Sequence, residues 1–188
     1  MSDIIIFITE ADIKETTFVD DNVDAKLIRQ TIREAMDIHI QPILGTTLFE
    51  ELKTQINSST LTTLNTTLLE SYVRFALIYW TLYEGVDVFV YKFRNKGVQK
   101  QTSENGLVID TDELKRLMDR FRNKAEWYSE RVTKYLIENE TSYPSYLNPD
   151  SGIDVIQPKR NNYTTGWYLG GTRGRSDKYP PSQEDCCS

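Results

Sequence analysis

The stretch from Asp37 to Phe49, DIHIQPILGTTLF, constrains the fold of this chain more than any other. Pro42 lacks a backbone donor and restricts the residue before it, so a helix that enters this stretch is predicted to stop there. Gly45 can adopt a positive φ that closes a helix end. Thr47 followed by Glu50 has the spacing of a capping box for the next helix. The sequence therefore predicts a tight, apolar corner between two helices, and the stretch contains no catalytic constellation.

Apolar residues repeat at spacings of three and four along most of the chain before residue 140, which is the pattern of amphipathic helices. The predicted helices span residues 9–17, 24–40, 47–56, 64–94 and 111–139. Gly85 and the β-branched run after it predict that the end of the fourth helix kinks, or becomes irregular where it meets another part of the molecule. The predicted fold class is mainly α: a bundle of about four to five helices with a small β-hairpin and an extended C-terminal arm.

A β-hairpin is predicted between the last two helices. Gly97–Thr102 and Leu107–Asp110 would pair, with Asn105 and Gly106 as the turn. An isolated hairpin is marginal in water, so we expect it to lean on another subunit.

The composition changes after Tyr143 and Pro144. We divide the chain into a helical domain, residues 1–144 with the hairpin near 97–110, and a C-terminal docking arm, residues 145–188. The arm has proline and glycine breakers but also many aromatic residues, whereas disordered linkers are normally poor in them. We therefore predict that the arm becomes ordered against a protein partner, with aromatic anchors and charged contacts. The predicted interface residues of arm and hairpin are Tyr146, Tyr163, Trp167, Tyr168, Arg173, Arg175, Tyr179, Asn105 and Gly106.

Composition argues against several function classes. The net charge is −6, and the arm's five basic and five acidic residues cancel, so the negative charge belongs to the helical body and disfavours a DNA-coating role. No apolar run approaches the length of a membrane span. Cys186 and Cys187 are adjacent and indicate no disulfide framework, which favours folding in a reducing compartment. His39 is the only histidine, so partners for a zinc site or a triad are lacking. We predict no catalytic residue, cofactor or metal.

Two other functions are compatible with the residues. The broad aromatic stripe of the fourth helix, which includes Tyr72, Tyr79, Trp80 and Tyr83, could line the pocket of a small cytosolic helical ligand-binding domain or enzyme. Arg74, Glu84 and tyrosine hydroxyls are the polar groups available there. A scaffold module that binds a host protein through the arm is the other alternative.

Four segments resemble the head–tail connector proteins (adaptor or head-completion proteins) of tailed bacteriophages. They are FITEADIK near the N-terminus, IRQTIREAMDIHIQPILGTTLFEEL through the corner, LLESYVRFALIYWTLYEG in the long helix, and YLIEN at the end of the last helix. The most specific piece is the helix that enters the P-I-L-G turn and is followed by L-F-x-x-L. The resemblance covers roughly residues 5–140, whereas the arm departs from the compact adaptor pattern and resembles extensions in ring proteins of crAss-like podoviruses.

The resemblance implies a structural virion protein, made in the host cytoplasm and located in the virion neck between capsid and tail. Such proteins form a homo-oligomeric ring, usually of twelve copies, that binds the portal protein and the next tail or ring component. The ring extends the DNA channel, so DNA passes through during genome ejection without sequence-specific binding. An acidic body is compatible with such a channel wall because it repels DNA phosphates. Head-to-tail ring closure needs two different complementary surfaces on each subunit.

Overall fold

The computed structural model describes residues 5–94, 97–100 and 110–160. The elements are α1 (Glu10–Thr16), α2 (Ala25–Ala35), a π-helical turn (Met36–Ile40), α3 (Gln41–Leu44), α4 (Thr46–Asn57), α5 (Thr63–Leu68), a second π-helical turn (Leu69–Val73), α6 (Arg74–Val90), β1 (Tyr91–Arg94), β2 (Gly97–Lys100), α7 (Thr111–Glu138), a 3-10 turn (Glu140–Ser142) and α8 (Pro144–Leu147). The prediction of a mainly helical fold is confirmed. No helix in these ranges is long and apolar enough to cross a bilayer.

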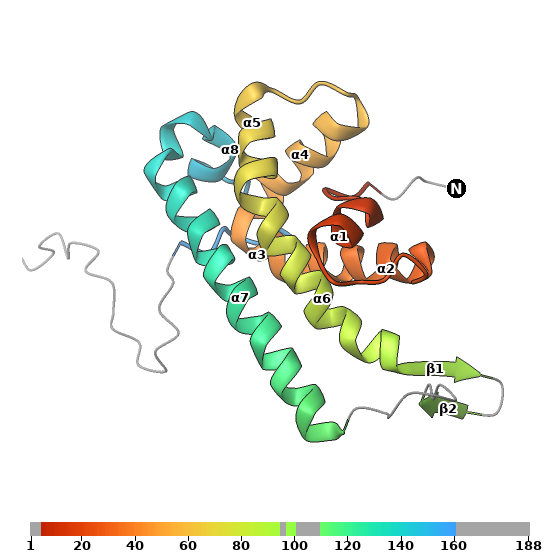
Figure 1. Cartoon of the computed structure of the whole chain (residues 1–188). Coiled ribbons are helices and arrows are strands. Elements are labelled where there is room, and N and C mark those ends of the chain that lie inside the picture. The colour runs from red at the N-terminus through yellow and green to blue at the C-terminus, as the bar shows by residue number, and fades with distance from the viewer. Residues whose placement is uncertain (1–4, 95–96, 101–109, 161–188) are drawn as a thin grey trace, which may run out of the picture.

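Helices α6 and α7 run antiparallel and form the long axis of the molecule (Figure 1). Helix α2 packs against α6 on the side away from α7, and α1 lies over α2 (Figure 1). The ion pair between Arg29 and Glu10, 2.5 Å apart, ties α1 to α2, and the Arg29 guanidinium holds the pKa of Glu10 below its ordinary value. The core lies where α2, α3, α4 and α6 meet. Its fully buried side chains include Ile28, Ile32, Met36, Leu44, Leu48, Leu52 and Leu77.

The structure has the predicted corner between two helices, but the first helix ends and the second begins at other residues than predicted. Helical backbone continues through Pro42 and ends at Gly45, because the π-helical turn before it places the proline in the first turn of α3, where its missing N–H is tolerated. Gly45 has φ +78° and ψ 154°, a conformation that is essentially restricted to glycine. The predicted Thr47 capping box is wrong, since α4 begins one residue earlier and has no side-chain cap.

The segment after α8, residues 148–160, returns to this corner, and we call it the return segment. It supplies the cap that α4 lacks: the Thr46 N–H donates to the Ile156 carbonyl at 2.9 Å, and the Ile156 N–H donates to Thr46 Oγ1 at 2.9 Å. The Lys159 N–H donates to the Pro42 carbonyl, also at 2.9 Å. These contacts satisfy backbone groups that a helix end leaves without partners. The described part of the predicted arm is therefore extended and lies on the helical body of its own chain.

The predicted helix over residues 64–94 differs from the structure in two ways. A π-helical turn at Leu69–Val73 separates α5 from α6, and strand β1 follows α6 directly. Helix α6 continues through Gly85 to Val90 and gives way to strand β1 at Tyr91. Gly85 is buried, and a Cβ there would lie 2.7 Å from the Phe89 ring, so this glycine makes room for an aromatic side chain within the helix.

The predicted hairpin is not supported. Strand β2 pairs antiparallel with β1, the segment before it, in the register Tyr91 opposite Lys100 and Arg94 opposite Gly97. Asn105, Gly106 and most of the predicted second strand lie outside the described residues. The pairing follows from sequence proximity, because β1 continues directly from α6 and only two residues separate it from β2. The strand pair stands away from the helices at the end of α6 (Figure 1).

Candidate functional site: a groove beside helix α7

A groove lies between α7 and the segment that enters the corner. Its volume is about 360 Å³, which is within the range of about 300–1,000 Å³ typical of binding pockets. Its walls come from α7, α6, the first π-helical turn, α3 and the return segment. The lining residues are Ile38, His39, Pro42, Ile43, Trp80, Glu126, Ser129, Glu130, Thr133 and Lys159.

The π-helical turn Met36–Ile40 determines which side chains reach this groove. Met36 and Ile40 point into the core and are 1% exposed, whereas Ile38 is 56% exposed. His39 lies flat on the Trp80 ring, with centroids 3.7 Å apart and planes at 4°. A π-helical turn adds a residue to the helical repeat, and such turns are frequent at functional sites. Here it makes an apolar wall with an aromatic floor.

The polar side chains that α6, α7 and the π-helical turn contribute to the groove are paired within the chain. His39 Nε2 lies 2.7 Å from Glu84 Oε1, and the Trp80 indole N–H donates to Ser129 Oγ at 2.9 Å. On the rim, Glu126 contacts Arg122 at 2.9 Å and Glu130 lies 3.9 Å from Lys134. Over the described ranges, no group of three His, Cys, Asp or Glu side chains is placed to hold a metal ion. The groove is therefore suited to receiving an apolar or aromatic group beside an acidic rim.

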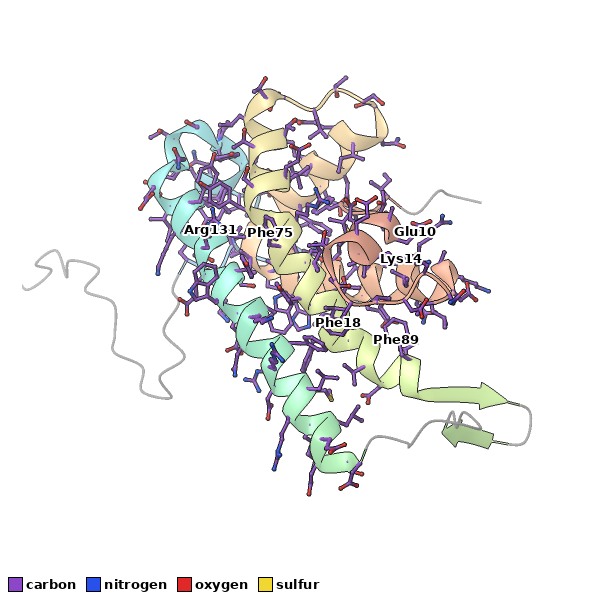
Figure 2. All side chains as sticks on the ribbon, in the orientation of Figure 1. Glu10, Lys14, Phe18, Phe75, Phe89 and Arg131 are labelled. Carbon is purple, nitrogen blue, oxygen red and sulfur yellow. The ribbon has the colours of Figure 1, made fainter. Side chains whose placement is uncertain are left out.

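The opposite side of the α6–α7 contact carries stacked aromatic side chains, which we call the aromatic seam. Tyr72 stacks on Tyr135 at 4.0 Å, and Tyr128 stacks on both Phe75 and Tyr79, at 5.5 and 5.4 Å between ring centroids. Two cations, Lys124 and Arg131, lie over tyrosine rings of the seam. Phe75 and one of these cations, Arg131, are seen together between α6 and α7 in Figure 2. The aromatic stripe of the sequence is thus divided: Trp80 lies in the groove with Tyr83 packed edge to face against it, whereas Tyr72 and Tyr79 lie in the seam.

A smaller cavity of about 260 Å³ lies at the other end of the bundle, near α5 and α8. Tyr143 is 2% exposed there and donates to the Leu64 carbonyl at 3.2 Å. Burial, together with the hydrogen bond to Tyr135, raises the pKa of the Tyr143 phenol. Ser145 bonds to Glu51 at this end. The bonds of Tyr143, directly before α8, and of Ser145 within it hold α8 on the body.

The structure places Tyr146 differently from the prediction. It belongs to α8 and is 0% exposed, so the folded chain cannot present it as an interface residue of an arm. Burial raises the pKa of its phenol, and Arg160 lies over the ring at 5.1 Å. The other predicted interface residues lie outside the described part of the chain: Tyr163, Trp167, Tyr168, Arg173, Arg175, Tyr179, Asn105 and Gly106.

Sequence reasoning missed the residues that distinguish the two sides of α7. Trp127 is 60% exposed, and its neighbours at helical spacing, Asn123, Lys124, Glu130 and Arg131, are polar. An apolar residue out of phase with the buried stripe of α7 is the signal that could have identified it. Ile38 gave no such signal, because its exposure depends on the π-helical turn.

The model of a family of unknown function (DUF6712) matches residues 40–155, from the corner through α7 and α8 into the return segment. No curated protein matches the chain, and neither does any solved structure.

Proposed function

The chain belongs to the family of unknown function DUF6712, and we propose that it is a non-enzymatic structural virion protein that forms an oligomeric ring between portal and tail. Because the sequence resembles phage head–tail connectors, we expect the ring to contain about twelve copies. The ring extends the DNA channel in the virion neck. Its partners are other copies of the chain, the portal protein and the next tail component.

The observation that carries this proposal is the projecting strand pair. Strands β1 and β2 form a two-stranded sheet at the end of α6, away from the helical body (Figure 1). A two-stranded ribbon is marginal in water unless it packs against something else. A neighbouring subunit provides that surface in a ring.

Two further properties support an assembly role. The net charge of −6 suits a channel wall that DNA passes without adhering. Trp127, Ile38 and Phe18 expose 60%, 56% and 74% of their surface, and large exposed apolar side chains are typical of protein interfaces.

The experiment is light scattering with negative-stain imaging of the purified full-length chain over a range of concentrations. A closed oligomer of uniform mass, with a central opening, is the expected result. A monomer at every concentration overturns the ring. That result favours the second candidate, a helical ligand-binding domain, for which the groove beside Trp80 is the supporting observation.

A further inference from the structure

One face of α7 carries a basic stripe with a tryptophan at its centre. Arg120, Lys124, Trp127 and Arg131 follow one another at spacings of four, three and four, so they lie on one face of the helix. We call these four residues the basic ridge.

Three of the four ridge residues contact the aromatic seam beneath them. Lys124 Nζ lies 5.0 Å from the centre of the Tyr79 ring, and the Arg131 guanidinium lies 4.9 Å from that of Tyr72. Trp127 meets Tyr128 edge to face, with centroids 4.8 Å apart and planes at 88°. Tryptophan and arginine are the side chains that contribute most often to binding at protein interfaces. A ridge that is already ordered loses little conformational entropy when it binds.

The groove lies on the other side of the same helix. Each residue of an α-helix turns by about 100°, so positions two apart point in nearly opposite directions. Lys124 of the ridge and Glu126 of the groove are such a pair, as are Arg131 and Thr133. Each copy of the chain therefore carries one ridge and one groove, facing different ways.

The ridge and the groove are complementary in charge and in apolar character. The ridge has three cations around an exposed indole. The groove has an apolar wall of Ile38, Pro42 and Ile43, with Glu126 and Glu130 on its α7 side and Lys159 on the side of the return segment. The glutamates contact Arg122 and Lys134 of their own helix, with carboxylate side chains that are 47% and 49% exposed. Such exposed pairs contribute little energy, so the carboxylates can exchange these cations for those of a partner.

We propose that Trp127 of one copy inserts into the groove of the next copy, head to tail. The basic residues of the inserted ridge then face Glu126 and Glu130 of the receiving copy. Because the two surfaces differ, the contact is heterologous and repeats from copy to copy until a ring closes. This inference rests on the proposed ring and names the contact that holds it together.

The test uses one variant of each surface. Trp127→Ala removes the inserted side chain, and Ile38→Lys puts a cation in the groove opposite the basic ridge. Both positions are more than half exposed, so both variants are expected to fold as the wild type does. Each should weaken self-association at least about thirtyfold, the effect of losing one central interface residue. Ile153→Ala is the matched control, because Ile153 is exposed but belongs to neither surface, and this variant should assemble normally.

Mixing the two variants gives the sharper result. Trp127→Ala chains keep an intact groove and Ile38→Lys chains keep an intact ridge, so a mixture can form one contact per pair. Native mass spectrometry should show heterodimers in the mixture and monomers in each variant alone.

Three outcomes would overturn the inference. If both variants assemble as the wild type does, the contact lies elsewhere and the ring itself still stands. If only Ile38→Lys fails to assemble, the groove receives a different segment. If the wild type is a monomer at every concentration, the proposed ring fails, and the head-to-tail contact fails with it.

Discussion

The corner and the far end of the α6–α7 pair are built in opposite ways. At the corner, Leu44, Leu48 and Leu52 are at most 1% exposed, and the return segment satisfies the backbone groups that the helix ends leave open. At the far end, which carries the strand pair, Leu114 is 8% exposed, and Leu117 and Met118 are only partly buried. The two regions belong to one bundle, but the first is a closed core, whereas the second is a contact between α6 and α7 to which the loop between α1 and α2 adds Phe18. The difference indicates that the corner supplies stability and that the far end is available for contacts with partners.

The largest predicted effect tests this division with the same substitution in both regions. Leu44→Ala should lower the free energy of unfolding by about 2–5 kcal/mol, because a fully buried leucine leaves a cavity. Leu117→Ala should cost roughly half as much or less, because less of its apolar surface is removed from water. Urea unfolding followed by circular dichroism measures both values. Equal losses would mean that the far end is as closely packed as the corner.

The second prediction concerns the contact between Gly45 and the return segment. A Cβ at this position would lie 2.8 Å from Pro158 Cδ, and φ is +78°. Gly45→Ala should therefore cost about 1–3 kcal/mol for the backbone conformation, with a steric cost in addition.

Pro158→Ala provides the control for this effect. In that background the steric part should decrease, while the cost of the positive φ stays the same. Thermal unfolding of the two single variants and the double variant separates the two parts. A strictly additive cycle would mean that the return segment does not press on the corner.

The third prediction uses the buried phenols of Tyr143 and Tyr146, which lie at and beside α8. Burial raises the pKa of Tyr143 and of Tyr146 in the folded chain, whereas both ionise near pH 10 when it unfolds. Because each phenol has a higher pKa in the folded chain than in the unfolded chain, it contributes to stability below pH ~10. This contribution is lost as the pH rises further, since the unfolded chain then ionises more readily than the folded one. The stability should therefore fall above pH 10 by up to about 1.4 kcal/mol per pH unit for each phenol.

Tyr146→Phe sharpens this prediction. The Tyr146 hydroxyl is buried and has no hydrogen-bond partner among the described residues, so its removal should leave stability at neutral pH unchanged or raise it by about 1 kcal/mol. The same variant should show a shallower loss above pH 10 in urea unfolding. An unchanged alkaline slope would mean that this phenol is open to solvent.

The sequence predicted the elements that depend on local periodicity. Helix α7 spans Thr111–Glu138 against a predicted 111–139, and Asp24 caps α2 at the predicted start. These helices have a strong apolar stripe, so local pattern and tertiary packing agree.

Features that depend on distant contacts were not predictable in the same way. The π-helical turns at Met36–Ile40 and Leu69–Val73 shift the side-chain direction without any distinctive residue. The cap of α4 comes from Ile156, more than a hundred positions away, so local capping rules indicated the wrong start. The groove follows from both effects, which explains why neither Ile38 nor Lys159 was recognised as a site residue.

The smallest predicted effect lies at the far end, where the loop between α1 and α2 reaches α7. Phe18 is 74% exposed but stacks on Phe121 with centroids 5.7 Å apart and planes at 19°. Phe18→Ala should lower the unfolding free energy by about 0.5–1.5 kcal/mol, the contribution of an aromatic pair. Phe18→Leu is the control, because it keeps an apolar contact without the stacked ring. It should lower the unfolding free energy by less than Phe18→Ala does. Urea unfolding measures both variants. If neither variant changes the free energy of unfolding, the exposed Phe18 ring contributes nothing to the stability of the fold.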